Sequence, residues 1–217
     1  MQDLLIIDLE MCRVDRNVIK GRGVYLDYEI IEIGAVILGK KNRIRDEFKT
    51  YVRPEYGNLD EFISDLTGIR EIDLGFAPAL KEALEKLAGW LQGREITACS
   101  WSDTDLIQLS VEMEQKKIEN AEIRRLLDGW VDLQRSYDMI TGAGRPTSLE
   151  RAMRAEGVRP EGRAHDGAAD ARNTALLIAR LLADGKELEM HPVNEVLEYH
   201  DEDDGACSGN PFFNIRF

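Results

Sequence analysis

Apolar residues near the start of the chain form short runs, and these runs predict strands. Residues 3–11 are an apolar stretch interrupted by two acids, which is typical of a buried strand whose end carries function. Residues 29–38 form a second apolar run, and the turn-rich residues 39–42 separate it from a third strand at about 44–52. We expect the second and third strands to pair as an antiparallel hairpin.

The middle of the chain changes to helical spacing. Residues 77–91 carry leucines three or four positions apart, which predicts an amphipathic helix that stops at Gly93. Residues 95–101 form the next predicted strand, and Asp103 or Thr104 can cap the helix that follows.

The following segment predicts one short strand and two helices. The strand lies near residues 130–133, and Thr147 with Glu150 fits a capping box that opens a helix ending near Gly157. Residues 166–182 are strongly helical, with apolar residues on one side. Early strands followed by helix–strand units indicate an α/β fold, in which a mixed sheet is flanked by helices.

Composition fits one globular domain that is not a membrane protein. With 217 residues, 43% of them hydrophobic and 32% charged, the chain can bury a sizeable core. We expect a soluble, cytoplasmic protein, because no apolar run is long enough to span a membrane and no basic segment precedes the first strand. Cys12, Cys99 and Cys207 are far apart, which favours buried or spectator thiols over disulfides or a zinc site.

The net charge of −13 argues against a protein that coats nucleic acid with a broad basic surface. Residues 184–217 hold nine acids against two bases, so we predict a domain over 1–183 and an acidic C-terminal tail over 184–217. The acidic run at 199–204 can be interpreted as a second metal site, but a solvated segment is the simpler interpretation. The apolar end, residues 211–217, can dock on this chain or on another.

Two acids in the first strand carry the first functional signal. Asp8 and Glu10 are two positions apart, so their side chains leave the same face of the sheet. Buried carboxylates need a positively charged partner, and hard divalent cations suit them. The alternative is that the strand end lies at the solvent edge.

Asp103 and Asp105, which follow a later strand, are the second functional signal. We assign Asp103 to capping and Asp105 to metal.

The third signal pairs His165, at or just before the last helix, with Asp170 inside it. The small residues 167–169 allow this helix to approach another element closely. Taken alone, the histidine can be structural and the acid a solvated helix residue. Three acid sites in this order argue against a purely structural role for these two residues.

Together these residues resemble a known family. D-x-E on the first strand, an Asp after a later strand and H-x(4)-D on the final helix are similar to the three exonuclease motifs of the DEDDh superfamily. FKTYVRP at 48–54, LTGI at 66–69, WL at 90–91 and VDLQ at 131–134 resemble the branch that contains KapD and the histone-mRNA 3′ exonuclease. The resemblance covers about residues 3–183.

The resemblance implies an RNase H-like fold with a five-stranded sheet, two Mg²⁺ or Mn²⁺ ions, and release of nucleoside 5′-monophosphates from the 3′ ends of single-stranded RNA or DNA, with RNA favoured. It implies that Asp8 bridges the ions and that Glu10, Asp105 and Asp170 complete their shells, with His165 as the general base beside Glu10 in catalysis. It further implies that the terminal nucleotide contacts Met11, Cys12, Leu66, Thr67 and Ile69, for which ordinary packing is the alternative.

Some residues depart from the family pattern around the substrate. Ser102 and Thr104 replace a Gly and an aromatic residue that are common in the second motif, and Asp166 replaces a base in the third, for which Arg163 can compensate. Trp101 can stack on a base or be buried.

One loop adds a hypothesis about substrate. The loop after the first strand, residues 13–27, is net basic, so we hypothesise that Lys20 and Arg22 hold the substrate backbone, the alternative being a solvated loop.

Two other functions stay open. An RNase H-like endonuclease would use the same acids to cut internally, although the spacing of His165 and Asp170 disfavours it. A non-catalytic module that binds nucleic acid or protein would keep the fold but usually loses one or more of the carboxylates.

Overall fold

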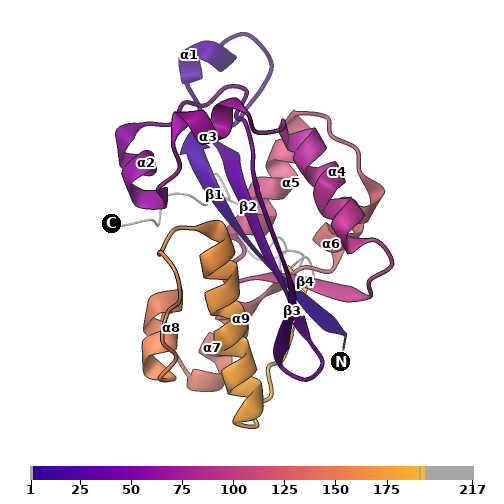
Figure 1. The fold of residues 1–217 in the computed structure, drawn as a ribbon, viewed down its shortest axis with the longest axis vertical. Helices are drawn as coiled ribbons and strands as arrows, with labels where there is room; N and C mark the ends of the chain where they lie inside the picture. The colour runs from indigo at the N-terminus through magenta and orange to yellow at the C-terminus, as the bar shows by residue number, and fades with distance from the viewer. Residues whose placement is uncertain (1, 191, 194–217) are drawn as a thin grey trace, which may run out of the picture.

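A five-stranded mixed sheet runs through the centre of the computed structural model, which describes residues 2–190 and 192–193 (Figure 1). The strands are β1 (Asp3–Arg13), β2 (Tyr28–Gly39), β3 (Arg43–Tyr51), β4 (Ile96–Ser100) and β5 (Val131–Asp132). Their order is β3-β2-β1-β4-β5; β2 pairs antiparallel with β1 and β3, and β4 pairs parallel with β1 and β5. The predicted mixed sheet and hairpin are confirmed.

Helices cover both faces of the sheet (Figure 1). One face packs against α4 (Leu80–Leu91), α5 (Thr104–Gln115) and α6 (Ala121–Asp128), and the other against α7 (Leu133–Thr141), α8 (Leu149–Ala155) and α9 (Gly167–Ala183). The short helices α1 (Arg16–Ile19), α2 (Glu61–Thr67) and α3 (Glu71–Gly75) gather at the end of the sheet where β1 finishes.

Side chains of β1 alternate between two apolar cores. Leu5, Ile7 and Leu9 pack with α4, α5 and α6, whereas Leu4 and Ile6 pack with α7, α8 and α9. The next two residues with the parity of Leu4 and Ile6 are acidic. The strand is therefore apolar on both faces except where it passes the N-terminus of α9.

Three predicted boundaries shift, and in each case hydrogen bonds at the boundary accompany the shift. The helix predicted from residue 77 begins at Leu80, since the Ala77 N–H closes a turn with Leu74 and the Pro78 carbonyl accepts from Arg53. The last strand is only two residues long, because Asp132 caps the N-terminus of α7.

The cap of α8 also moves by one position. Ser148, rather than Thr147, accepts a hydrogen bond from the backbone N–H of Arg151. Thr147 makes a different contact: its backbone carbonyl accepts a hydrogen bond from the Trp101 indole N–H at 3.0 Å. The predicted capping box at Thr147 was therefore one residue early.

The first residues of the predicted tail pack on the domain. The Val193 N–H donates to the Trp130 carbonyl at 2.8 Å, and the Ser136 hydroxyl donates to the Glu189 carbonyl at 2.8 Å. A division between 183 and 184 stays a prediction, and the runs at 199–204 and 211–217, like Cys207, lie outside the described residues. In the described part of the chain, no helix combines the length and apolar character needed to cross a bilayer.

Candidate active site

Asp8 and Glu10 leave β1 on the face that α9 covers. Burial raises the pKa of Glu10 to about 8, and the negative charges of Glu32 and Asp170 add to the effect. Burial also raises the pKa of Asp8 well above its usual range, together with the charges of Asp105 and Glu10. Each acid thus lies in the field of the others, and a positive charge placed between them would relieve the repulsion.

Asp105 reaches this cluster from the first turn of α5. Its side chain is buried, and its Oδ1 accepts a 2.9 Å hydrogen bond from the backbone N–H of Leu9, between the two acids of β1. Burial raises the pKa of Asp105 to about 7, although the hydrogen bond from Leu9 acts in the opposite direction. Asp103 occupies the N-cap position of α5 without a side-chain capping hydrogen bond.

His165 and Asp170 come from the start of α9. The backbone of His165 has φ +61°, a left-handed conformation in which histidine is enriched, and the N–H of His165 donates to the Asp170 carboxylate at 2.8 Å. Potential ligand atoms of Glu10, His165 and Asp170 all lie within 4.8 Å of one another. The first and third predicted signals therefore meet in space, and the exposed His165 lies at their edge.

Glycines let α9 come this close. A Cβ on Gly34 of β2 would lie 2.1 Å from the carbonyl carbon of Gly167, and a Cβ on Gly167 would lie 3.0 Å from the carbonyl oxygen of Asp8. Backbone therefore packs directly on backbone where the helix begins. The close approach predicted from the small residues at 167–169 is confirmed.

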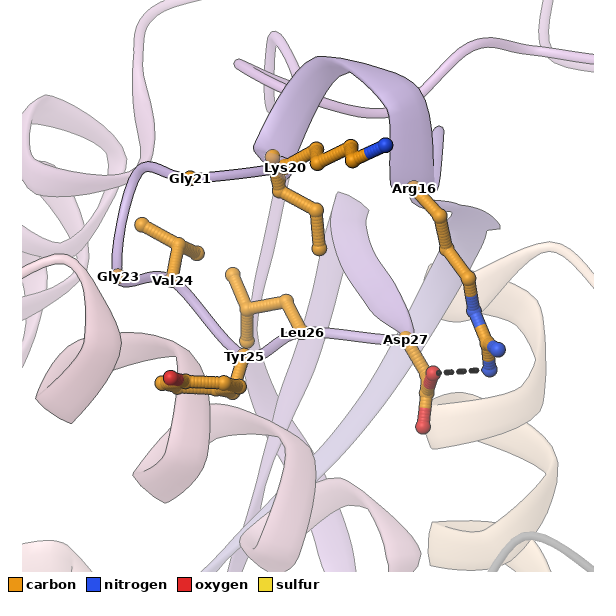
Figure 2. A pocket seen from close by; sticks show the side chains of 9 residues that line it. Arg16, Lys20, Gly21, Gly23, Val24, Tyr25, Leu26 and Asp27 are labelled. Atoms are coloured by element: carbon orange, nitrogen blue, oxygen red, sulfur yellow. Dashed lines mark hydrogen bonds and ion pairs between the residues drawn. The ribbon is translucent and has the colours of Figure 1, made fainter.

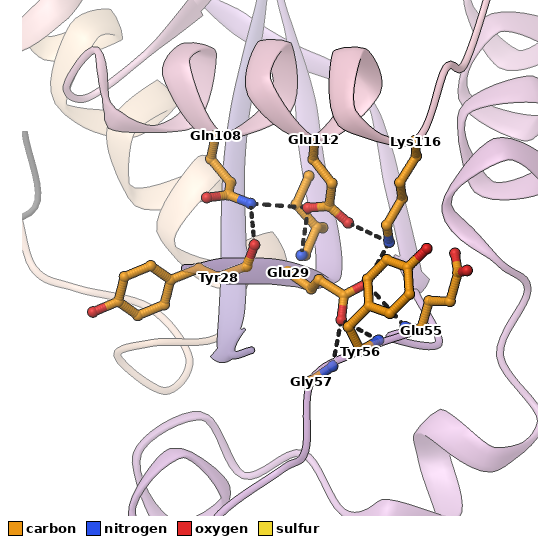
Figure 3. Close-up of polar contacts among 9 residues, drawn as sticks. Tyr28, Glu29, Glu55, Tyr56, Gly57, Gln108, Glu112 and Lys116 are labelled. Atoms are coloured by element: carbon orange, nitrogen blue, oxygen red, sulfur yellow. Dashed lines mark hydrogen bonds and ion pairs between the residues drawn. The ribbon is translucent and has the colours of Figure 1, made fainter. Parts of the chain in front are cut away.

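A second group of buried acids, Glu29 and Glu112, has its negative charge compensated by protein groups (Figure 3). The Lys116 ammonium lies between Glu29 and Glu112, 2.8 Å from the latter, and Glu29 also accepts hydrogen bonds from the backbone of residues 55–57. Lysine and backbone donors thus satisfy those carboxylates. Asp8 and Glu10 have raised pKa values and lie among other acids, and an all-oxygen set of this kind fits a hard divalent cation.

Glu32 and Lys49 are part of the site and were missed by the sequence reasoning. Glu32 pairs directly with Glu10 across β1 and β2 and is 1% exposed. Lys49 of β3 contacts both Glu32 and Asp166, the residue that caps α9. The available signal was Glu32 itself, which together with Glu29 interrupts the apolar run of β2, but nothing in the sequence paired Glu32 with Lys49.

The predicted nucleotide-binding residues separate into half-buried and buried ones. Met11 and Leu66 are half-buried, so part of each side chain is accessible. Cys12 and Ile69 are 0% and 1% exposed in one apolar cluster, and burial raises the pKa of the Cys12 thiol to about 12. The side chains of Cys12 and Ile69 therefore pack in the interior, and their contact with a nucleotide stays a prediction. The hydroxyl of the buried Thr67 donates to the Ile63 carbonyl and accepts from the Ile69 N–H.

Two residues raised as open alternatives have structural contacts. Trp101 is 8% exposed and donates to the Thr147 carbonyl, so it is buried rather than available for stacking. Arg163 donates to the carbonyl of Asp65 and lies over Gly68 at the C-terminus of α2. Arg163 therefore joins the segment before His165 to the LTGI segment.

The basic loop between β1 and β2 surrounds a hollow of about 720 Å³ (Figure 2). Lys20 and the 80% exposed Tyr25 line it, whereas Arg16 forms an ion pair with Asp27. Arg22 lies 6.0 Å from the centre of the Tyr56 ring. Cations and an exposed aromatic ring thus occur together just beyond the strand that carries Asp8.

Comparisons with known proteins agree with this geometry. A family model described as exonuclease, RNase T, matches residues 5–178. ERI1 exoribonuclease 2 of Xenopus laevis is 33% identical over 84% of this chain, and 3′-5′ exoribonuclease 1 of Rattus norvegicus is 29% identical over 76% of it. The chain spans 28% and 50% of the length of these relatives.

A solved structure shares the fold. The nuclease domain of 3′hExo, described as a DEDDh family member bound to rAMP, superimposes with a TM-score of 0.75 at 25% identity, over 88% of this chain and 96% of that one. The expected RNase H-like architecture is thereby confirmed.

Proposed function

Because the chain belongs to the RNase T family of exonucleases, we propose that it is a divalent-metal-dependent 3′→5′ exoribonuclease. The observation that carries this proposal is the convergence of Asp8, Glu10, Asp105 and Asp170 from β1, α5 and α9, with His165 beside them. The alternative of a non-catalytic module loses support because the complete acid set and the histidine are brought together.

Two Mg²⁺ or Mn²⁺ ions are the proposed cofactors. Asp8, Glu10, Asp105 and Asp170 would hold them through their carboxylate oxygens. When bound, the ions would neutralise charge on the scissile phosphate and on the leaving oxygen. The raised pKa values of Glu10 and Asp105 support this assignment, since ions would replace the protons that these acids retain without metal.

His165 would act as the general base. It is exposed at the edge of the acid cluster, and its backbone N–H donates to the carboxylate of Asp170, which holds the His165 backbone against the start of α9. The imidazole would accept the proton of the attacking water, which contributes roughly 10²–10⁴-fold to such reactions.

The proposed substrate is the 3′ end of single-stranded RNA, because the relatives named above are exoribonucleases. Met11 and Leu66 would contact the terminal nucleotide, and Thr67 would shape that segment through its hydrogen bonds. Lys20 and Arg22 would hold the backbone further along, with Tyr25 available to stack on a base. A cytoplasmic location and the division between domain and tail stay predictions.

Degradation of RNA and DNA oligomers labelled at either end tests the proposal. With Mg²⁺ or Mn²⁺, wild type should release mononucleotides from the 3′ end, RNA faster than DNA, and Asp8→Ala should not. Oligomers of mixed length would favour the endonuclease. If neither product forms and calorimetry detects no Mn²⁺ binding, a non-catalytic module is the better description.

A further inference from the structure

Lys49 lies beside the candidate metal site without being one of its expected ligands. Its Nζ is 3.1 Å from a carboxylate oxygen of Glu32 and 2.6 Å from one of Asp166. A single ammonium therefore joins β2, β3 and the start of α9. The Glu32 side chain is 1% exposed, and an acid buried so deeply is costly without a cation beside it.

The two partners of Lys49 also hold the backbone of α9. Glu32 accepts a hydrogen bond from the Ala168 N–H at 3.3 Å, and Asp166 accepts one from the Ala169 N–H at 3.0 Å. Asp170 is the next residue along the helix, and His165 directly precedes Asp166. The contacts of Lys49 thus reach the two amides that precede Asp170.

The sheet places this arrangement opposite the first motif. Glu32 is the cross-strand partner of Glu10, and Lys49 contacts Glu32 from the next strand. The close backbone packing of Gly34 on Gly167 leaves little room for α9 to adjust. Because Glu32 and Asp166 accept hydrogen bonds from the first amides of α9, a displacement of either carboxylate would disturb this packing and shift the start of the helix relative to Glu10.

We propose that Lys49 is a positioning residue that joins Glu32 to Asp166 and so fixes the start of α9, with His165 and Asp170, against Glu10. The consequence for turnover rests on the proposed function, whereas the consequence for the helix does not. Lys49 acts through these two carboxylates and does not need to touch the substrate.

Amide hydrogen exchange in the metal-free protein tests the structural part. Lys49→Met keeps an unbranched side chain and removes the charge, and should speed exchange of the Ala168 and Ala169 amides by at least about tenfold. Lys49→Arg and the control Lys41→Met, at an exposed position in the β2–β3 turn, should leave both amides close to wild type. Unchanged exchange in Lys49→Met would overturn the proposal.

Metal affinity separates positioning from simple charge balance. Removing a cation from a cluster of acids should tighten Mn²⁺ binding if charge alone matters. Loss of positioning should instead weaken Mn²⁺ binding about 10–100-fold, as is usual for residues that support metal ligands. Calorimetry that shows tighter or equal binding in Lys49→Met would contradict the positioning role.

A second variant keeps the test decisive if Lys49→Met fails to fold. Asp166→Asn retains the capping oxygen for α9 and removes the charge that Lys49 contacts, and it should change exchange and Mn²⁺ affinity in the same directions. Wild-type behaviour of Asp166→Asn would overturn the proposal in that case. If wild-type protein binds Mn²⁺ but degrades no nucleic acid, the proposed function fails, while these two measurements still decide the role of Lys49.

Discussion

The backbone N–H of Leu9 donates a 2.9 Å hydrogen bond to the Asp105 carboxylate and so ties the first turn of α5 to the middle of β1. Asp105→Asn keeps an oxygen for this bond and removes the charge. We expect nuclease activity and Mn²⁺ affinity to fall by at least about 100-fold, with little change in melting temperature. Kinetics, calorimetry and thermal unfolding check this.

Two further variants serve as controls for the Asp105→Asn prediction. Asp105→Ala also leaves the Leu9 N–H without its acceptor and should cost about 1–3 kcal/mol of unfolding free energy. Asp103→Asn, at a position without a side-chain capping bond, should stay near wild type in both assays. An active Asp105→Asn protein would mean that Asp105 has been assigned wrongly.

The raised pKa of Glu10 predicts how stability depends on pH without metal. Between its ordinary value of 4.5 and about 8, Glu10 keeps a proton in the folded protein but loses it in the unfolded chain. The folded state then binds more protons, so the unfolding free energy falls as pH rises, by up to about 1.4 kcal/mol per pH unit. Thermal unfolding in EDTA across this range should show the loss.

Glu10→Gln provides the matched control for this effect. The glutamine cannot titrate, so the variant should lose less stability than wild type as pH rises across the same range. Mn²⁺ should stabilise wild type more at the alkaline end than at the acid end, because protons then compete less with the ion. Equal pH dependence in wild type and Glu10→Gln would argue against the raised pKa.

The sequence predicted the sheet well because alternation and apolar runs are local signals. The strands at residues 3–11 and 29–38 were expected within two residues of their observed ends. The short helices α1, α2, α3, α6 and α7 were missed, since four to nine residues give little helical periodicity. Glu32 was read only as part of a strand, and its place opposite Glu10 depends on strand register.

Residue identity alone could not separate contact from packing near the substrate. Cys12 lies in β1 only two residues after Glu10, yet its side chain packs in an apolar cluster with Ile69. From the sequence, Asp166 replaces a basic residue of the third motif, and Arg163 was the residue expected to supply the missing positive charge. Instead Lys49, 117 residues earlier, brings the cation to Asp166, and a pairing at such sequence separation appears only in three dimensions.

His165 predicts a specific change in the pH profile. If its imidazole accepts the proton of the attacking water, His165→Gln should lower kcat by roughly 10²–10⁴-fold. A general base acts only when it carries no proton, so the variant should also lose the decline in kcat that wild type shows toward acid pH. Single-turnover rates across the pH range measure both effects. A profile with the wild-type shape in His165→Gln would assign the base elsewhere.

The basic loop predicts a salt effect separate from chemistry. Lys20→Ala combined with Arg22→Ala should raise KM for single-stranded RNA and leave kcat close to wild type. If both cations contact phosphates, the slope of log affinity against log salt should become shallower by about 1.4, or about 0.7 per contact. Lys40→Ala with Lys41→Ala, in the exposed β2–β3 turn, is the matched control. An unchanged slope would leave the loop without a role in binding.

The close packing of α9 on Gly34 can be tested by an alanine substitution there, with the same substitution at Gly89 as the control. Gly34→Ala would put a methyl group 2.1 Å from the carbonyl carbon of Gly167, which backbone cannot tolerate without moving. We expect a loss of about 1–3 kcal/mol of stability or more, together with weaker Mn²⁺ binding, because the displaced helix carries Asp170.

Gly89 is exposed within α4 and has open space around its Cβ position, so alanine there should stabilise the helix by up to about 1 kcal/mol. Stability and metal affinity should therefore fall together in Gly34→Ala and neither should fall in Gly89→Ala. If Gly34→Ala lost stability but bound Mn²⁺ normally, the site would tolerate movement of α9, and its ligands would be less rigidly placed than the packing indicates.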